Sequence, residues 1–270
     1  MASFDSAYFN IGYLDRLSYQ NTVIHRLDPR GKVIVTMLFV ITVISYAKYE
    51  VISLIPFFIF PVLLISLSDT PFLLIMKKVL FVSPFAIFIG IFNPFFDAGT
   101  VVLWHNIHIS AGWISLLSIM IKFTLTISAA LLLIATTSFP GICNALQRLG
   151  VPAPFTSQLL FLYRYIFVLM EEAMRMARAR DLRTFGGHGT GIKVFVRLIG
   201  LLFIRTMERA ERIYQSMLSR SFTGNIPSIR QYCFRLSDAA FVFLTVIFLV
   251  GLRLFNVTEI IGRYVQRLIA

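Results

Sequence analysis

The sequence predicts an all-α, polytopic membrane protein with about five transmembrane helices and two further long helices on the cytoplasmic side. The first observation is composition: 57% of the 270 residues are hydrophobic and the mean hydropathy is +0.80, too apolar for an ordinary soluble domain. The second is a series of apolar runs separated by short polar turns. The third is the stretch 157–224, whose two basic halves both show helical patterning. We interpret them as two long helices, each of which ends at a glycine at the C-terminal cap.

The N-terminal segment, residues 1–32, is polar and aromatic and shows no secretory signal pattern. We expect it to be cytoplasmic and to lead into the first apolar helix. Asp28 followed by Pro29 is typical of a helix start, with Asp28 as the N-cap and Pro29 in the first turn. Capping explains most of this pattern, and a docking role for Arg30 is the additional hypothesis.

Residues 33–137 contain four apolar runs, which we interpret as four transmembrane helices. The runs cover residues 33–47, 51–67, 79–92 (with residue 72 as an alternative start) and 113–136. Several are shorter than the ~20 residues that a span usually needs, but neighbouring helices can satisfy the backbone around prolines such as Pro56. Because Lys122 lies deep in the fourth run, we expect it to face the protein interior or a polar groove.

Residues 138–237 form a basic region, with 14 of the 25 Lys/Arg but 5 of the 13 Asp/Glu. We expect two long helices here, joined by a glycine hinge at Gly186-Gly187, with the second helix covering about residues 193–221. Such a pair makes a surface that transmits movement and does not make a catalytic pocket. The methionines of this region fit an adaptable binding surface and ordinary core packing equally well. They are Met170, Met174, Met176, Met207 and Met217.

Residues 238–270 hold a final apolar run, 239–252, and a tail with three arginines. The loop 93–112 contains no Lys or Arg and is therefore placed outside, whereas the turn at Lys77-Lys78 is placed inside. The N-terminus and the basic region are then cytoplasmic. Whether residues 260–270 form a sixth span, and on which side the C-terminus lies, stays open.

The chain lacks a nucleotide-binding motif. The glycine-rich stretch 186–193 superficially resembles a P-loop, but Ile192 separates Gly191 from Lys193 and the preceding element is a predicted helix. We therefore expect no ATP site and no enzymatic activity in this chain.

Residue types that often carry metal or redox chemistry are sparse. His105 and His108 stand in a loop that holds few other ligand types, so a structural role is favoured over a metal site. Cys143 and Cys233 imply no disulfide framework, and we expect both to be small buried residues. No catalytic residue, metal site or cofactor is predicted.

Several motifs, taken in chain order, resemble one family. They are Leu27-Asp28-Pro29-Arg30-x-Lys32, Thr136-Thr137-Ser138, Leu146-Gln147-Arg148-Leu149-Gly150-Val151-Pro152, Tyr163-Arg164-Tyr165 and Glu208-Arg209-Ala210-Glu211-Arg212-Ile213-Tyr214-x-Ser216-Met217 followed by Arg220. Together they resemble the transmembrane T component of energy-coupling factor (ECF) transporters, ABC importers of metals and vitamins in prokaryotes. The last motif is most similar to the cobalt or nickel subgroup.

The resemblance implies that two Ala-Arg-Gly-like triplets on crossing coupling helices dock into grooves of two partner ATPases. Here the triplets are Ala179-Arg180-Asp181 and Ser219-Arg220-Ser221. Asp181 and Ser221 replace a common glycine, and Ser219 replaces alanine. A guanidinium binds a carboxylate through two parallel hydrogen bonds, so we expect acidic partners. Additional docking residues are Arg30, Arg183, Arg209 and Arg212.

The expected function is that of a coupling subunit of a cobalt importer in the prokaryotic inner membrane. It would link two ABC ATPases to a separate substrate-binding membrane subunit and would not bind nucleic acid. The alternatives are the same subunit in a nickel or vitamin importer, a basic anchor that binds anionic lipid or nucleic acid, and a membrane-embedded enzyme. Within the spans only Lys122 would serve the last of these.

Overall fold

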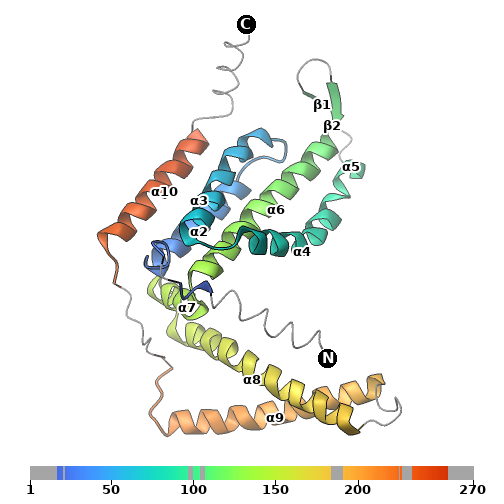
Figure 1. Cartoon of the computed structure of the whole chain (residues 1–270), viewed down its shortest axis with the longest axis vertical. Coiled ribbons are helices and arrows are strands. Elements are labelled where there is room, and N and C mark those ends of the chain that lie inside the picture. Colours follow the sequence, from blue (N-terminus) through green and yellow to red (C-terminus); the bar gives the residue numbers. More distant parts are fainter. Residues whose placement is uncertain are drawn as a thin grey trace. The chain divides into compact units, whose positions relative to one another are not determined.

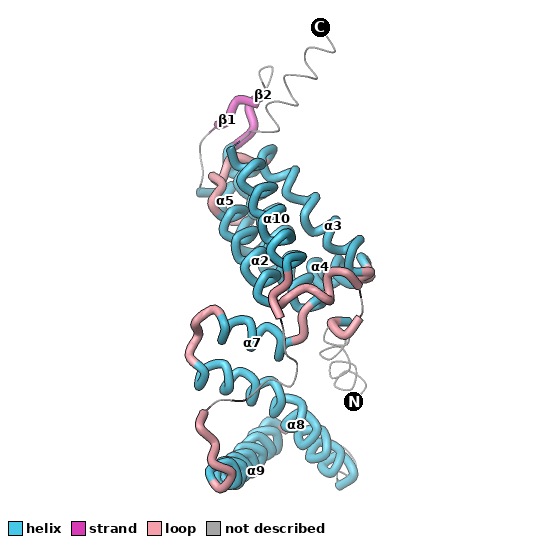
Figure 2. Tube along the Cα trace, turned by 90° about the vertical axis from the view of Figure 1, so that its left-hand side faces the viewer, coloured by secondary structure: helices cyan, strands magenta, loops and turns pink. Residues whose placement is uncertain are grey.

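The computed structural model describes residues 17–20, 22–96, 100–103, 107–183, 191–224, 226 and 233–254. The chain divides into two compact units. The bundle unit comprises Leu14–Ser138 and Tyr232–Ala270, and the basic unit comprises Met1–Tyr13 and Phe139–Gln231. In the described residues both units are helical, and the bundle unit also contains one short hairpin (Figure 1, Figure 2).

The bundle unit is built around its longest described helix, α6, Ala111–Thr136. This helix packs against α2, α3 and α4, and α2 also packs against α10. The remaining described elements are α2 (Pro29–Ile44), the 3-10 helix η1 (Ile52–Phe58), α3 (Ile59–Ser68), α4 (Phe72–Gly90), α5 (Asn93–Phe96), the antiparallel strands β1 (Thr100–Leu103) and β2 (Ile107–Ser110), and α10 (Leu236–Leu254).

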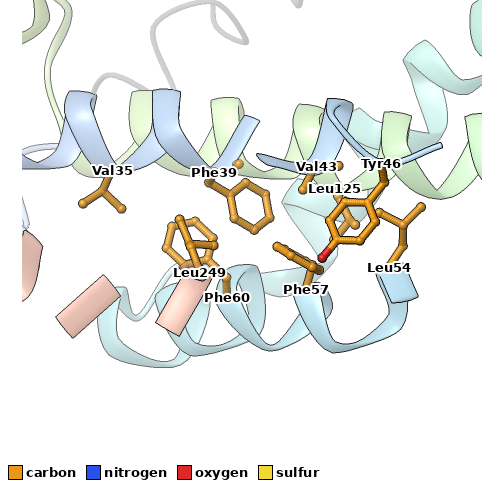
Figure 3. Packing of buried hydrophobic residues seen from close by; sticks show 10 residues of the cluster. Val35, Phe39, Val43, Tyr46, Leu54, Phe57, Phe60, Leu125 and Leu249 are labelled. Atoms are coloured by element: carbon orange, nitrogen blue, oxygen red, sulfur yellow. The ribbon is translucent and has the colours of Figure 1, made fainter. Parts of the chain in front are cut away.

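Aromatic rings form the centre of the bundle core. Phe39 of α2 stacks on Phe60 of α3 with ring centroids 4.4 Å apart, and Phe57 lies 6.1 Å from Phe39 (Figure 3). Leu125 of α6 and Leu249 of α10 close the same cluster. Because the rings come from α2, η1 and α3 and the two leucines come from α6 and α10, the burial of this cluster fixes how these helices pack together.

By length and hydropathy, four of the described helices could cross a membrane. They are Phe72–Gly90, Gly112–Thr136, Ala153–Arg183 and Leu236–Leu254. The segment Ile52–Ser68 is apolar but shorter. These helices confirm the predicted all-α membrane fold. Phe81, Phe85 and Phe88 of α4 are 85%, 67% and 66% exposed, as expected for side chains that face lipid.

Three details of the bundle differ from the sequence prediction. The run 51–67 is not one α-helix, because Pro56 lies in the 3-10 helix η1 and the α-helix begins only at Ile59. The helix after Pro71 begins at Phe72, which confirms the alternative start, and Lys77 and Lys78 therefore lie within this helix and not in a turn. A short hairpin, β1 and β2, occupies part of the predicted outer loop.

The basic unit contains α7 (Phe139–Arg148), α8 (Ala153–Arg183) and α9 (Ile192–Leu218). The Phe139 ring stacks on Tyr163 at 4.6 Å, which holds α7 on α8. Ser157 at the start of α8 donates a 2.8 Å hydrogen bond to the carbonyl of Gly224, just beyond α9. The end of α9 therefore returns toward the start of α8, and the two helices run in broadly opposite directions (Figure 1).

Helix ends test the capping predictions directly. Asp28 caps α2 as expected: its side chain accepts a 2.9 Å hydrogen bond from the Arg30 amide, and Pro29 occupies the first turn. The prediction that glycine ends the second long helix is wrong. α9 ends at Leu218, and Ser221 adopts the left-handed conformation, with φ 57°, while Gly224 follows with φ 86°. Gly186 and Gly187 lie outside the described residues.

Lys122 is half-buried and turns toward backbone carbonyls of a neighbouring segment, which agrees with the predicted place at the protein interior or in a polar groove. Its ammonium donates to the carbonyl of Tyr46 at 2.6 Å and approaches that of Ala47 at 3.5 Å, both just beyond the C-terminus of α2. A helix C-terminus offers carbonyls without intrahelical partners, which suit a cation. The lysine therefore ties α6 to the end of α2, and this accounts for a charge inside an apolar helix without invoking catalysis.

Candidate functional site

The first predicted triplet lies in the last turns of α8 and contains its own ion pair. Arg180 donates from Nε and Nη2 to Asp181 Oδ1, at 2.9 Å and 2.6 Å. The two side chains are 28% and 34% exposed. A pair this accessible contributes at most about 1 kcal/mol. Another carboxylate can therefore replace Asp181 at small cost in free energy. The ion pair was not predicted, although Arg180 and Asp181 are adjacent in the sequence.

The second triplet lies just beyond the end of α9. Ser219 is the C-cap in right-handed geometry, and Arg220 is exposed. Ser221 stands in left-handed geometry, and the Phe222 amide donates to the Met217 carbonyl at 3.1 Å. The left-handed conformation favours glycine because it has no Cβ. A glycine at position 221 would therefore adopt this conformation with less strain than Ser221 does.

The structure separates the two arginines widely. Gly224, four residues after Arg220, is bonded to Ser157 at the start of α8, whereas Arg180 lies near the end of the same helix. With a rise of ~1.5 Å per residue, residues 157 and 180 are roughly 35 Å apart. One binding pocket cannot hold both arginines, so the two triplets are two separate candidate sites.

Contacts between α8 and α9 hold this spacing. Glu172 of α8 accepts from Arg205 of α9 at 2.7 Å, and its other oxygen lies 3.2 Å from Arg175. Glu172 and Arg175 stand three residues apart on α8, a spacing that brings two side chains together on one helix face. Arg205 was not predicted, because single-sequence spacing carries no signal for a pair between helices.

An apolar groove of about 570 Å³ lies between the same two helices. Met170, Met174 and Met176 of α8 line it, with Phe195 and Leu202 of α9 opposite. Arg180 and Asp181 also lie along its edge. Met207 is 52% exposed, whereas Met176 is 8% exposed. The methionines therefore split between the two roles considered for them, and those in the groove offer an adaptable apolar surface next to the first triplet.

The additional docking candidates fall in different places. Arg183, Arg209 and Arg212 are exposed on the basic unit, where Arg212 lies 3.9 Å from Glu208. Arg30 belongs to the bundle unit, is 28% exposed, and places Nε 3.8 Å from Asp28 Oδ1. Arg30 therefore lies at the start of α2 in the bundle unit, whereas the other three candidates belong to the basic unit.

Other chemistry-bearing residues show no assembled centre. Among the described residues, no group of three His, Cys, Asp or Glu side chains could hold a metal ion. Cys143 is buried as predicted, and burial raises the pKa of its thiol to about 11. Cys233 is exposed, so the prediction of burial is wrong for it. His105 and the side chain of His108 lie outside the described residues.

Comparison with known proteins gives consistent matches. A family model described as the cobalt transport protein CbiQ matches residues 20–232. The energy-coupling factor transporter transmembrane protein EcfT of Leuconostoc gelidum subsp. gasicomitatum is 28% identical over 217 residues, covering 75% of this chain and 80% of that protein.

Two further relatives extend the comparison. Uncharacterized protein MJ1571 of Methanocaldococcus jannaschii is 29% identical over 255 residues, covering 90% of this chain and 86% of that protein. The cobalt transport protein CbiQ of Salmonella typhimurium is 32% identical over 101 residues, covering 37% of this chain and 44% of that protein.

Proposed function

Because the chain belongs to the CbiQ family of cobalt transport proteins and is related to transmembrane components of energy-coupling factor transporters, we propose that it is the coupling subunit of an ECF-type cobalt importer. The observation that supports this role most directly is the α8–α9 pair, which presents an arginine near each of two points roughly 35 Å apart. Two ATPase subunits provide two such points. In this proposal the chain itself hydrolyses no ATP.

Docking in this proposal is an exchange of charge partners. Arg180 leaves Asp181 and binds a carboxylate of one ATPase, while Arg220, which is exposed, binds the other. The flanking residues Ala179, Ser219 and Ser221 are small enough to let the ATPase backbone approach. Arg183, Arg209 and Arg212 add long-range attraction, and Arg30 is an additional contact.

Movement then passes along the two helices. When the ATPases close on ATP, their grooves carry the two ends of the pair, and α8 and α9 change their crossing. The apolar groove next to the first triplet carries this change to a separate substrate-binding membrane subunit, which releases cobalt into the cytoplasm. The proposed organisation is residues 1–32 and 138–237 in the cytoplasm, 33–137 and 238–270 as membrane segments, in the prokaryotic inner membrane.

The test is a charge reversal in the assembled transporter. The chain is co-expressed with two ABC ATPase subunits and a cobalt-binding membrane subunit from the same organism, and the Arg180→Glu/Arg220→Glu double variant is compared with Arg197→Glu. Arg197 is an exposed arginine of α9 outside both triplets, and therefore a matched control. We expect the double variant to lose co-purified ATPase and ATP-driven uptake of radioactive cobalt, while the control keeps both.

Each competing outcome is informative. Normal uptake by the double variant would refute docking through these triplets. Uptake of nickel in preference to cobalt, or of a vitamin, would keep the coupling role and change the cargo. If no ATPase co-purifies with the wild type and the membranes instead bind polyanions in a salt-sensitive way, the chain is a basic anchor.

A further inference from the structure

The chain crosses between its two units three times, after Tyr13, after Ser138 and before Tyr232. The second crossing lies two residues beyond the end of α6 at Thr136, and the third lies four residues before α10 begins at Leu236. A displacement of the basic unit therefore pulls on the ends of α6 and α10 through these two links. The contacts that hold those helix ends decide whether the rest of the bundle moves with them.

The end of α6 is held by two side chains from the segment before and at the start of α2. Lys32 Nζ donates to the Thr136 carbonyl at 2.8 Å, and His25 Nε2 donates to the Ala135 carbonyl at 3.3 Å. Lys32 is 5% exposed and His25 8% exposed. The last carbonyls of a helix lack intrahelical partners and carry partial negative charge. Both side chains therefore donate to carbonyls that have no other partner within α6, and this stabilises the end of the helix.

The start of α10 is held by the same segment. Asp238 accepts from the Arg235 amide at 2.7 Å through one oxygen and from the Asp28 amide at 2.9 Å through the other. Gly31 allows the close approach, because a Cβ there would lie 3.1 Å from Val242 Cγ2. Residues 25–32 thus bind α6 with two side chains and α10 through one backbone amide.

We propose that His25, Lys32 and Asp238 are positioning residues for coupling: together they form a helix-end clamp that fixes the links at the end of α6 and at the start of α10 relative to α2. The inference rests on the proposed coupling function. With the clamp intact, a pull on residue 139 or residue 231 moves α6, α2 and α10 as one body. With the clamp open, the pull unwinds the last turn of α6 and is lost.

The bundle supplies a matched control for Lys32. Lys122 performs the same chemistry, since its ammonium donates to the Tyr46 carbonyl at 2.6 Å beyond the C-terminus of α2. It too joins α2 to α6, but at the opposite end of α2, away from both links. Loss of either lysine removes one comparable tie between the same two helices, so a purely structural role predicts similar consequences for both.

The experiment measures coupling and stability in the same complex. Lys32→Met, Lys32→Arg and Lys122→Met are prepared with the ATPases and substrate subunit, and cobalt uptake per ATP hydrolysed and thermal unfolding are recorded. We expect both Met variants to unfold at lower temperature. Lys32→Met alone should lose about ten-fold or more in uptake per ATP, the change expected when a charge-assisted hydrogen bond is removed. Lys32→Arg should restore most of it.

Either of two results would overturn the clamp. The first is wild-type uptake per ATP in Lys32→Met. The second is an equal loss of uptake per ATP in Lys32→Met and Lys122→Met that follows their loss of thermal stability. If Lys32→Met does not assemble, Asp238→Asn, which keeps the shape but loses one of the two backbone bonds, is judged by the same criterion. Failure of the proposed function looks different, because the wild-type complex would then show no ATP-driven uptake at all.

Discussion

At the scale of the residue, His25 is a buried titratable group with a partner at each ring nitrogen. Nε2 faces the Ala135 carbonyl and Nδ1 lies 2.7 Å from Thr22 Oγ1, so the neutral ring carries its proton on Nε2. Burial lowers the pKa of His25 from its ordinary 6.5. The charge of Lys32 lowers it further, while the Ala135 and Leu17 carbonyls and the charge of Asp69 raise it.

This shift predicts acid sensitivity of the bundle. Because the pKa of His25 is lower in the folded chain than 6.5, the unfolded chain binds a proton more readily as the pH falls below 6.5. The contribution of His25 to the free energy of unfolding is therefore fully present above pH 6.5 and is lost as the pH falls through the folded pKa. We expect the thermal unfolding temperature in detergent to fall between about pH 7 and about pH 5. In His25→Gln the curve should flatten over this interval, and an unchanged pH profile would contradict the assignment.

At the scale of the element, the ends of α9 and the course of 51–67 show what a single sequence can and cannot predict. Asp28 and Pro29 predicted the start of α2 because a cap acts through neighbouring residues. The left-handed Ser221 was missed because the sequence offered glycine three residues later, and the 3-10 turn at Pro56 was missed because apolar runs carry no period. The Glu172–Arg205 pair depends on tertiary packing, which spacing does not encode.

Ser221 gives a prediction for the end of α9. The left-handed conformation costs a non-glycine residue about 1–2 kcal/mol. Glycine avoids this cost, but it loses more conformational entropy on folding, which offsets part of the gain. We therefore expect Ser221→Gly to stabilise the chain by up to about 1 kcal/mol. Ser219→Gly is the control, because Ser219 is right-handed with φ −63° and glycine should destabilise there. Denaturant unfolding of the purified protein measures both, and equal effects would exclude backbone strain at Ser221.

At the scale of the whole molecule, the candidate site is defined by the distance between the two arginine triplets. The sequence identified both arginine triplets, but not their separation, because that follows from the Ser157–Gly224 hydrogen bond and the opposite directions of α8 and α9. The resemblance to a family supplied the idea of two docking points. The geometry adds that the two triplets lie near opposite ends of α8, near positions 157 and 180, which are roughly 35 Å apart, several times the ~8 Å screening length at physiological ionic strength.

The separation makes a quantitative prediction about ATPase binding. Residues so far apart without shared partners contribute independently, so the losses in binding free energy should add within about 0.5 kcal/mol. We expect Arg180→Ala and Arg220→Ala each to cost about 1.5–3 kcal/mol, the range for a hydrogen bond to a charged group. The loss for Arg180 falls toward the lower limit, since its release from Asp181 is part of the exchange. Titration of ATPase onto the chain in nanodiscs measures the two single variants and the double variant. A double variant no worse than either single one would mean that both arginines serve one shared site, which this helix pair cannot provide.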